Sequence, residues 1–236
     1  MDFTVKDHYD LQDLLAIVRL LRDPAEGCPW DKVQTHQSIR RNFIEETYEV
    51  CDAIDQNDVA GLREELGDVL LQVALHTQME QEQGHFDFGD VADDICQKLV
   101  LRHPHIFGSA KAGDGSQALD NWEAIKKQSK GVTSAAQHAA AVPHCLPALM
   151  RAKKVQKRLA EEDSALKDRG QAISSLKNAV DCLDKDLQNC DNREELIGDA
   201  LYALVSVARL AGADAEEVLG FTCDRAISRH AQRQQK

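Results

Sequence analysis

The sequence predicts an all-α protein made of two tandem four-helix units. Long stretches follow the helical period of about 3.6 residues rather than the alternation of strands, and aromatic residues make up only 5% of the 236-residue chain. The stretch at residues 193–201 repeats much of the stretch at residues 63–70, with one residue inserted before a shared Gly-Asp pair. We therefore expect a first domain at residues 1–130, a linker at 131–147 and a second domain at 148–236.

The first two helices of the first domain have clear sequence signals. Residues 11–22 carry a continuous apolar stripe at helical spacing. A polar loop follows, and either Thr35 or Ser38 caps the next helix, because a hydroxyl side chain can accept a hydrogen bond from the first turn. We expect this second helix to end near Asp55.

Two further helices complete the first unit. The pair Asn57-Asp58 breaks the chain and caps a third helix, which extends over residues 59–82. A fourth helix is expected at residues 90–102, followed by a flexible loop at 108–116. A short helix then begins at Asn121.

Acidic residues cluster on the second and third helices. They are Glu45, Glu46 and Glu49, then Glu65 and Asp68. Spacings of three and four residues place such side chains on one helix face, and a hairpin of the two helices would bring at least four carboxylates together. Their repulsion would be severe without a cation, and oxygen ligands suit Mg²⁺ or Mn²⁺.

A solvated acidic face is the competing interpretation of these carboxylates. The position of Asp68 favours a metal site, because this residue interrupts an otherwise apolar run. A charge at the edge of a buried stripe is costly unless it is paired or bound to a metal.

Composition argues against several classes of function. The net charge of −12 and the pI of about 5.2 argue against a nucleic-acid polymer as the main partner. The first residues lack the apolar segment of a signal peptide, and no apolar run approaches the ~20 residues of a membrane span. Seven cysteines without a CxxC pair suit reduced thiols in a cytoplasmic protein. The sequence contains no phosphate-binding GxxxxGKS loop, no GxGxxG, no GxSxG and no HExxH.

Five motifs, in order, resemble the MazG family of the all-α NTP pyrophosphatase superfamily. They are GCPWDKVQT, EETYEV, REELGDVLLQV, KLVLRHPHIFG and WEAIKK. The family hallmark is EExxE followed by ExxD, which this chain carries in its five clustered acids. The resemblance covers most of residues 11–130 and extends more faintly to the second half, so it implies tandem MazG-like units with the catalytic domain first.

The resemblance implies a nucleoside triphosphate pyrophosphohydrolase that acts in nucleotide-pool control. Such an enzyme cleaves between the α and β phosphates with Mg²⁺, or Mn²⁺ as an alternative, and releases a monophosphate and pyrophosphate. By analogy, Glu46, Glu49, Glu65 and Asp68 bind the metal, and Glu45 binds a second metal or orients the water. One or two ions would clamp the attacking and leaving oxygens.

The resemblance also implies residues that bind the substrate. Lys98, Arg102 and Lys126 would balance the charge of the phosphates. Trp122 or Trp30 would contact the base or close the site, although a Trp in a loop can also anchor that loop to the core.

The second half departs from the family pattern. Alignment on its Gly-Asp pair puts Leu196 where the motif requires a glutamate, and Cys182 and Lys185 fall where two further glutamates are expected. Arg229-His230 echoes Arg102-His103 of the first half. We therefore expect a degenerate second copy, without activity, that supports packing or dimerisation.

Assembly and specificity complete the expectations. A unit of four short helices buries its apolar stripes poorly, so we expect a homodimer or a larger homo-oligomer. Two other functions stay open at this point. One is a pyrophosphatase specialised for dCTP, dUTP or a damaged nucleotide. The other is a helical, metal-binding interaction protein without catalysis.

Overall fold

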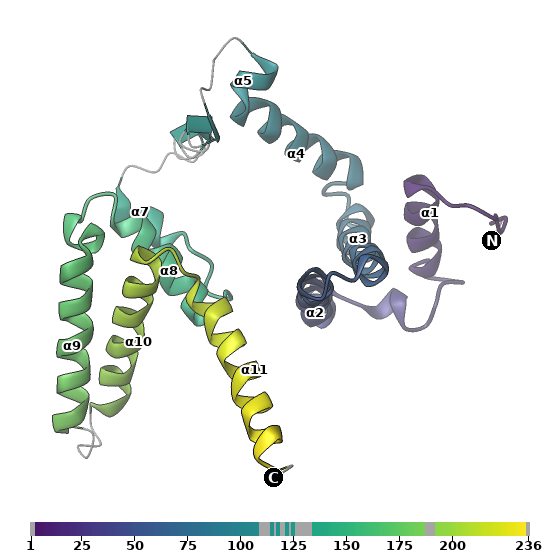
Figure 1. The fold of residues 1–236 in the computed structure, drawn as a ribbon. Helices are drawn as coiled ribbons and strands as arrows, with labels where there is room; N and C mark the ends of the chain where they lie inside the picture. The colour runs from purple at the N-terminus through teal and green to yellow at the C-terminus, as the bar shows by residue number, and fades with distance from the viewer. Residues whose placement is uncertain are drawn as a thin grey trace. The chain divides into compact units, whose positions relative to one another are not determined.

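The computed structural model describes residues 3–108, 114–115, 117–118, 121–122, 124–125, 134–186 and 192–234. Within these ranges every regular element is an α-helix or a short 3-10 helix, which confirms the all-α prediction (Figure 1). The chain divides into two compact units, Met1–Trp122 and Glu123–Lys236.

The first unit is organised around a helical hairpin. Its elements are α1 (Leu11–Leu21), the 3-10 helix η1 (Asp31–Val33), α2 (His36–Asp55), α3 (Val59–Glu82), α4 (Phe88–Arg102) and the short α5 (Pro104–Phe107). Helices α2 and α3 pack side by side, α1 packs against α3, and α4 contacts α3 to a smaller extent (Figure 1). These boundaries lie within two residues of those expected for the four main helices.

Local capping explains where the hairpin helices begin. Thr35 is the N-cap of α2: its hydroxyl accepts from the Ser38 amide at 3.2 Å, and the Ser38 hydroxyl accepts from the Thr35 amide at 2.9 Å. Asp58 caps α3 by accepting from the amides of Ala60 and Gly61. Asn57, with φ of 56°, adopts the left-handed conformation that reverses the chain between the two helices.

A small apolar core holds three helices of the first unit together. Its buried residues come from α1, α2 and α3, and partly buried leucines pack around them. The buried members are Val18, Ile39, Ala74, Leu75 and Met79. Those on the hairpin lie near the start of α2 and in the second half of α3, at the end of the hairpin away from its turn.

Arg22 fixes the loop that follows α1. Its side chain is 6% exposed and makes a forked pair with Glu82, with both nitrogen–oxygen distances at 2.8 Å. A further guanidinium nitrogen donates to the carbonyls of Asp31 at 2.6 Å and Gln34 at 3.2 Å. One buried cation thus joins the end of α1, the loop around η1 and the end of α3.

The second unit has the same kind of hairpin. Its elements are α7 (Ala135–Ala140), α8 (Ala148–Leu159), η2 (Ser164–Lys167), α9 (Arg169–Asp186), α10 (Arg193–Leu210) and α11 (Ala215–Gln234). Helices α9 and α10 pack against each other, and α8 packs against α10. Gln156 of α8 is fully buried, and its amide donates to the carbonyl of Tyr202 at 2.7 Å.

The predicted linker contains structure of its own. Ala135 and Ala139 of α7 are buried, and α7 packs against α8. The described part of residues 131–147 therefore belongs to the second unit, and the two units divide between Trp122 and Glu123 rather than at residue 130.

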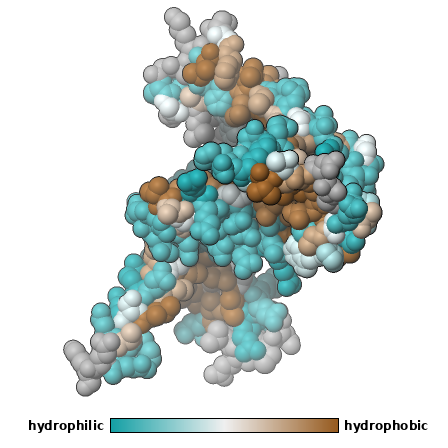
Figure 2. All heavy atoms as spheres, turned by 90° about the vertical axis from the view of Figure 1, so that its right-hand side faces the viewer, coloured by the Kyte–Doolittle hydropathy of each residue, from teal (hydrophilic) through white to brown (hydrophobic). Residues whose placement is uncertain are grey.

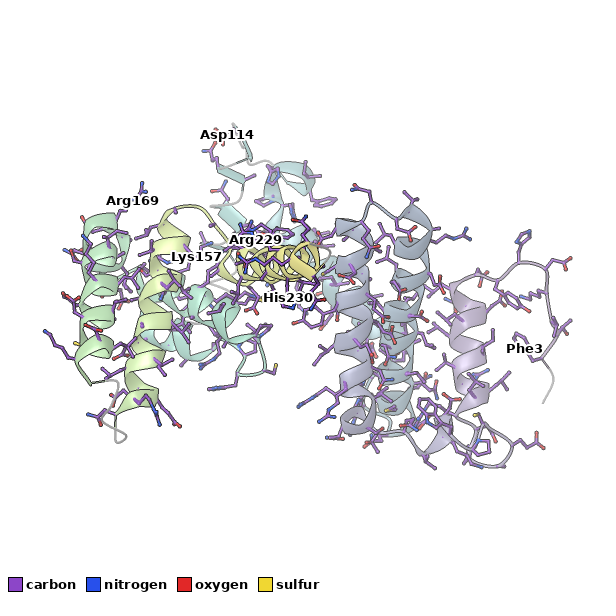
Figure 3. The ribbon with its side chains drawn as sticks, turned by 60° about the horizontal axis from the view of Figure 1, so that its bottom comes forward. Phe3, Asp114, Lys157, Arg169, Arg229 and His230 are labelled. Atoms are coloured by element: carbon purple, nitrogen blue, oxygen red, sulfur yellow. The ribbon has the colours of Figure 1, made fainter. Side chains whose placement is uncertain are left out.

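Helix α11 is exposed over most of its length, and Arg229 and His230 project from it (Figure 3). Hydrophobic side chains also reach the surface of the molecule in several patches (Figure 2). Among the described helices, none is by itself both long and apolar enough to cross a membrane. Helices α10 and α11 meet that criterion of length and composition only as a pair, bent by 102°.

We expect Arg22→Ala to lower the free energy of unfolding of the first unit by about 3 kcal/mol, because Glu82 and two backbone carbonyls lose their charged donor. Arg22→Lys keeps the charge but loses the fork, so it should cost about 1–2 kcal/mol. Urea unfolding followed by circular dichroism measures both. An unchanged midpoint for Arg22→Ala would show that this pair does not hold the loop.

Candidate active site

The hairpin of the first unit brings three carboxylates together. Glu46 and Glu49 come from α2 and Glu65 comes from α3, and one oxygen of each lies within 4.8 Å of the others. Glu46 and Glu65 are half-buried, whereas Glu49 is exposed. Acids from the two helices therefore converge, although three come together here where at least four were expected.

Burial and neighbouring charge make two of these carboxylates, Glu46 and Glu65, harder to ionise. Burial raises the pKa of Glu46 above its ordinary 4.5, and the charges of Asp68, Glu49 and Glu65 raise it further. Burial also raises the pKa of Glu65, with Glu49 as its main charged neighbour. The main charged groups that shift these two pKa values are all carboxylates.

Asp68 and Glu45 occupy different places around this cluster. Asp68 is half-buried on α3 and lies close enough to raise the pKa of both Glu46 and Glu65, although it is not one of the three converging side chains. Glu45 is exposed and lies outside the three-carboxylate group. The structure thus gives a compact set of three with two flanking acids.

The donor set fits a hard divalent cation. All three converging ligands are carboxylate oxygens, the type that Mg²⁺ and Mn²⁺ prefer. Oxygens on opposite sides of one Mg²⁺ lie about 4.2 Å apart, so a spacing within 4.8 Å has the right size for one ion. The upward pKa shifts of Glu46 and Glu65 point the same way, because burial and the neighbouring carboxylates both disfavour the charged forms and a bound cation would favour them.

The candidate phosphate ligands lie on α4. Lys98 is exposed and pairs with Asp94 at 3.4 Å. Arg102 is half-buried, and its guanidinium carbon lies 5.3 Å from the ring centroid of Trp122. Neither cation is among the main causes of the pKa shifts of Glu46 and Glu65. Their role toward phosphate stays a prediction.

Trp30 and Lys126 are the remaining substrate candidates. The residue Trp30 is 56% exposed, so it is not buried in the core of the first unit, and its carbonyl accepts from the Gln34 side chain at 2.9 Å. Lys126 lies outside the described residues. Contact between either residue and a nucleotide therefore stays a prediction.

Sequence reasoning missed a histidine cluster at the other end of the hairpin. His36 lies 2.7 Å from His76, Nδ1 to Nδ1, and its Nε2 lies 2.6 Å from Glu80. His85 reaches the second oxygen of Glu80 at 2.7 Å. The cluster borders a cavity of about 730 Å³. Among the residues of this histidine cluster, the sequence offers one signal, which is the spacing of His76 and Glu80 one turn apart on α3.

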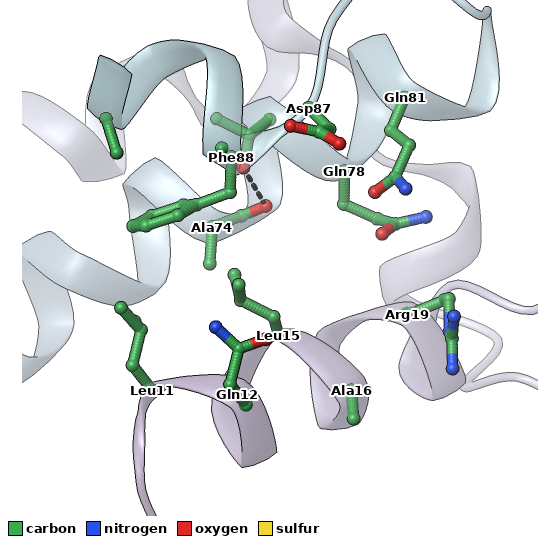
Figure 4. A pocket seen from close by; sticks show the side chains of 13 residues that line it. Leu11, Gln12, Leu15, Ala16, Arg19, Ala74, Gln78, Gln81, Asp87 and Phe88 are labelled. Atoms are coloured by element: carbon green, nitrogen blue, oxygen red, sulfur yellow. Dashed lines mark hydrogen bonds between the residues drawn. The ribbon is translucent and has the colours of Figure 1, made fainter.

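A second cavity of the first unit, of about 550 Å³, lies between α1, α3 and the start of α4 (Figure 4). Leu11 and Leu15 face Ala74 and Phe88 across it, with Gln78 and Gln81 at the side (Figure 4). None of the predicted metal ligands lines this cavity.

Comparison with known proteins identifies the first unit. Residues 34–107 match the family model of the MazG nucleotide pyrophosphohydrolase domain. The chain is 43% identical over 212 residues to the nucleoside triphosphate pyrophosphohydrolase of Escherichia coli K12, covering 87% of this chain and 80% of that protein. The chain belongs to the MazG family.

Two further relatives extend the match across both units. The nucleoside triphosphate pyrophosphohydrolase/pyrophosphatase MazG of Thermotoga maritima is 36% identical over 208 residues, or 88% of this chain and 79% of that protein. The uncharacterised protein YabN of Bacillus subtilis is 40% identical over 221 residues, or 92% of this chain and 45% of that protein.

Membership of the MazG family makes the chain a hydrolase, and the interpretation as a non-enzymatic binding protein is wrong. The matched residues include all five acids of the site together with Lys98 and Arg102. Trp30, Trp122 and Lys126 lie outside the matched range.

The structure revises how the second half of this MazG protein corresponds to the first. The buried and half-buried residues of α2 and α9 recur at the same intervals, so the two helices can be aligned on them. In order, this alignment pairs Ile39, Phe43, Glu46 and Val50 with Ala172, Leu176, Ala179 and Leu183. On α3 and α10, buried Gln72, Ala74 and Leu75 pair with Ala203, Val205 and Ser206.

This pairing moves the expected glutamate positions of the second half by one helical turn. Cys182 takes the place of Glu49, and Ala179 takes the place of Glu46. The sequence alignment had instead put Lys185 at a ligand position, which is wrong because Lys185 lies nearly one turn beyond Cys182. Leu196 remains in the place of Glu65, as predicted.

We expect Glu65→Gln to raise the thermal midpoint of the first unit in the presence of a chelator. Because the pKa of Glu65 is raised in the folded protein, its ionised form opposes folding, and this loss of stability grows as the pH rises from 4.5 through the raised value. Addition of Mg²⁺ should then raise the thermal midpoint of this variant by less than it raises the midpoint of the parent protein. Differential scanning calorimetry at neutral pH measures both effects.

The matched control is Asp52→Asn, which removes an exposed acid of α2 outside the cluster. It should leave the midpoint nearly unchanged in both conditions. If Glu65→Gln destabilised the protein in chelator, the converging carboxylates would not repel one another as described.

Proposed function

We propose that this chain hydrolyses nucleoside triphosphates between the α and β phosphates, with Mg²⁺, to a monophosphate and pyrophosphate. The observation that carries the proposal is the convergence of Glu46, Glu49 and Glu65, with Asp68 beside them, in a MazG-family hairpin. The names of the relatives from E. coli and T. maritima support the substrate class.

Four carboxylates would hold the cation: Glu46, Glu49, Glu65 and Asp68. When bound, Mg²⁺ would neutralise phosphate charge and polarise the phosphoryl oxygens. The four acids also disfavour binding of a free triphosphate, because unscreened carboxylates repel its phosphates. The substrate therefore enters together with its metal, and Mn²⁺ has the oxygen preference needed to replace Mg²⁺.

The other residues of the site orient the reactants. Glu45, exposed and next to Glu46, is suited to hold the attacking water and accept its proton. Water adds to the phosphorus on one side of the α–β bridging oxygen, that phosphorus–oxygen bond breaks, and one proton passes to solvent. Lys98, Arg102 and Lys126 would bind the phosphates.

Base contact falls to the aromatic residues in this proposal. Trp122 is held against the Arg102 guanidinium, which places an aromatic ring and a phosphate-binding cation in one group. Trp30 offers an exposed ring from the loop that Arg22 fixes. Either ring can stack on a base of any identity.

Turnover should depend on the first unit. We expect Asp68→Asn and Glu49→Gln each to reduce the initial rate to less than about a tenth of the parent rate at saturating Mg²⁺, because each removes one anionic ligand. Chromatography should identify a nucleoside monophosphate and pyrophosphate as the first products. Circular dichroism checks that each variant is folded.

Asp52→Asn serves as the control and should retain the parent rate. A diphosphate and orthophosphate as primary products would overturn the proposed cleavage position. If Asp68→Asn retained turnover while Asp199→Asn abolished it, the active site would lie in the second unit.

We also propose that the enzyme is a homodimer or a larger homo-oligomer. The hairpin leaves apolar side chains exposed on both helices, among them Ile44 and Tyr48 on α2 and Leu66 and Leu70 on α3. An apolar surface of this kind is normally covered by a partner, and pairing of two copies would bury it.

Light scattering should therefore give at least twice the 26.2 kDa mass of one chain. Leu70→Glu should shift the mass toward a single chain, because it places a charge on the exposed hairpin face. Val5→Glu, at an exposed apolar residue outside the helices, should leave the mass unchanged. A parent mass of one chain at micromolar concentration would refute the assembly.

A further inference from the structure

The second unit holds a cavity of about 470 Å³ between α9 and α10, here called the α9–α10 cavity. Its walls include all five positions that correspond to the acids of the first unit. In the order of Glu45, Glu46, Glu49, Glu65 and Asp68, these are Asn178, Ala179, Cys182, Leu196 and Asp199. The cavity therefore occupies the place of the active site, with one acid left of five.

Small side chains create this space. Ala172 stands where the first unit has Ile39, and Ser206 stands where it has Leu75. Both larger residues belong to the buried core of the first unit, at 1% and 3% exposure. The second unit thus lacks side chains that fill the corresponding hairpin. Unfilled volume between helices costs stability, whereas a volume of this size is typical of small-molecule sites.

A buried network holds the walls of the cavity in place. Gln156 is fully buried and binds the carbonyl of Tyr202 at 2.7 Å, and Tyr202 lines the cavity. Arg209 donates to the carbonyl of Leu166, another lining residue, at 2.5 Å, and to the Gln156 side chain at 3.5 Å. The guanidinium of Arg209, the cation of this network, is therefore engaged with a backbone carbonyl.

The lining chemistry disfavours phosphate and metal. Its polar side chains are neutral amides and hydroxyls, apart from Asp199, and no Lys, Arg or His lies among the lining residues that the structure describes. A free triphosphate would meet the carboxylate of Asp199, and Arg209, which contacts the lining residues Leu166 and Ser206, is already engaged in the wall network. A single carboxylate also provides too few charged ligands to hold Mg²⁺ firmly.

The same chemistry suits an uncharged nucleoside. A carboxylate can accept hydrogen bonds from ribose hydroxyls, as acidic residues do in dinucleotide sites. An amide such as Asn178 can pair with the edge of a base, and the ring of Tyr202 offers an aromatic wall. We propose that the α9–α10 cavity is a metal-independent binding site for a neutral nucleoside.

The test uses the full chain in the presence of a chelator, so that its result does not depend on turnover. Adenosine, guanosine, cytidine and uridine are each added at millimolar concentration, and alkylation of individual cysteines is followed by peptide mass spectrometry. At least one nucleoside should slow alkylation of Cys182, which lines the cavity. Alkylation of Cys223, exposed on α11, should keep its rate.

Calorimetric titration compares each nucleoside with its triphosphate. The bound nucleoside should have at least about tenfold higher affinity than its triphosphate in chelator, a difference of about 1.4 kcal/mol. Ser206→Leu restores the first-unit side chain, fills the cavity and should abolish both binding and protection of Cys182. Its thermal midpoint should not fall, because it removes empty volume.

Lys185→Ala is the matched control on α9, outside the cavity walls, and should retain binding. Ala203→Gln provides a second filling variant if Ser206→Leu fails to fold. Absence of protection by all four nucleosides would overturn the proposal. So would protection that survives a folded filling variant, or binding of a polyamine but of no nucleoside.

Discussion

Mutual repulsion of carboxylates across one helical hairpin is the constraint that the first unit must withstand. Glu46 and Glu49 on α2 face Glu65 on α3 within 4.8 Å, and burial together with the neighbouring carboxylates raises the pKa values of Glu46 and Glu65. The packed core and the Arg22–Glu82 pair lie toward the end of the hairpin away from its turn. Attraction at that end offsets repulsion nearer the turn, so the binding geometry exists before any cation arrives.

Local signals made much of this fold predictable. The third helix was expected at residues 59–82 and forms there, because Asp58 caps it and an apolar period sustains it. Convergence of Glu46, Glu49 and Glu65 followed from spacing on two helices joined by a short turn. The long-range pair between Arg22 and Glu82 has no such local signal, since sixty residues separate the partners.

The second half shows where sequence comparison alone fails. A shared Gly-Asp pair aligned α10 correctly, but no comparable motif marks α9, and only burial of Ala172 and Ala179 reveals its register. The alignment from sequence is displaced by one helical turn on α9, so it puts Lys185 at a position that Cys182 occupies in the structure, at a wall of the cavity. Placement of Lys98 and Arg102 relative to the carboxylates likewise depends on tertiary packing of α4, which residue spacing does not encode.

The contact between His36 and His76 has a consequence for acidity. Two imidazole nitrogens 2.7 Å apart can share one proton but cannot each carry one, so one ring must present a lone pair there. Burial and the neighbouring ring hold the pKa of His76 below its ordinary 6.5. The contact that joins the start of α2 to α3 therefore accommodates one proton between the two nitrogens. A second proton there would place two N–H groups against each other and push the two helices apart.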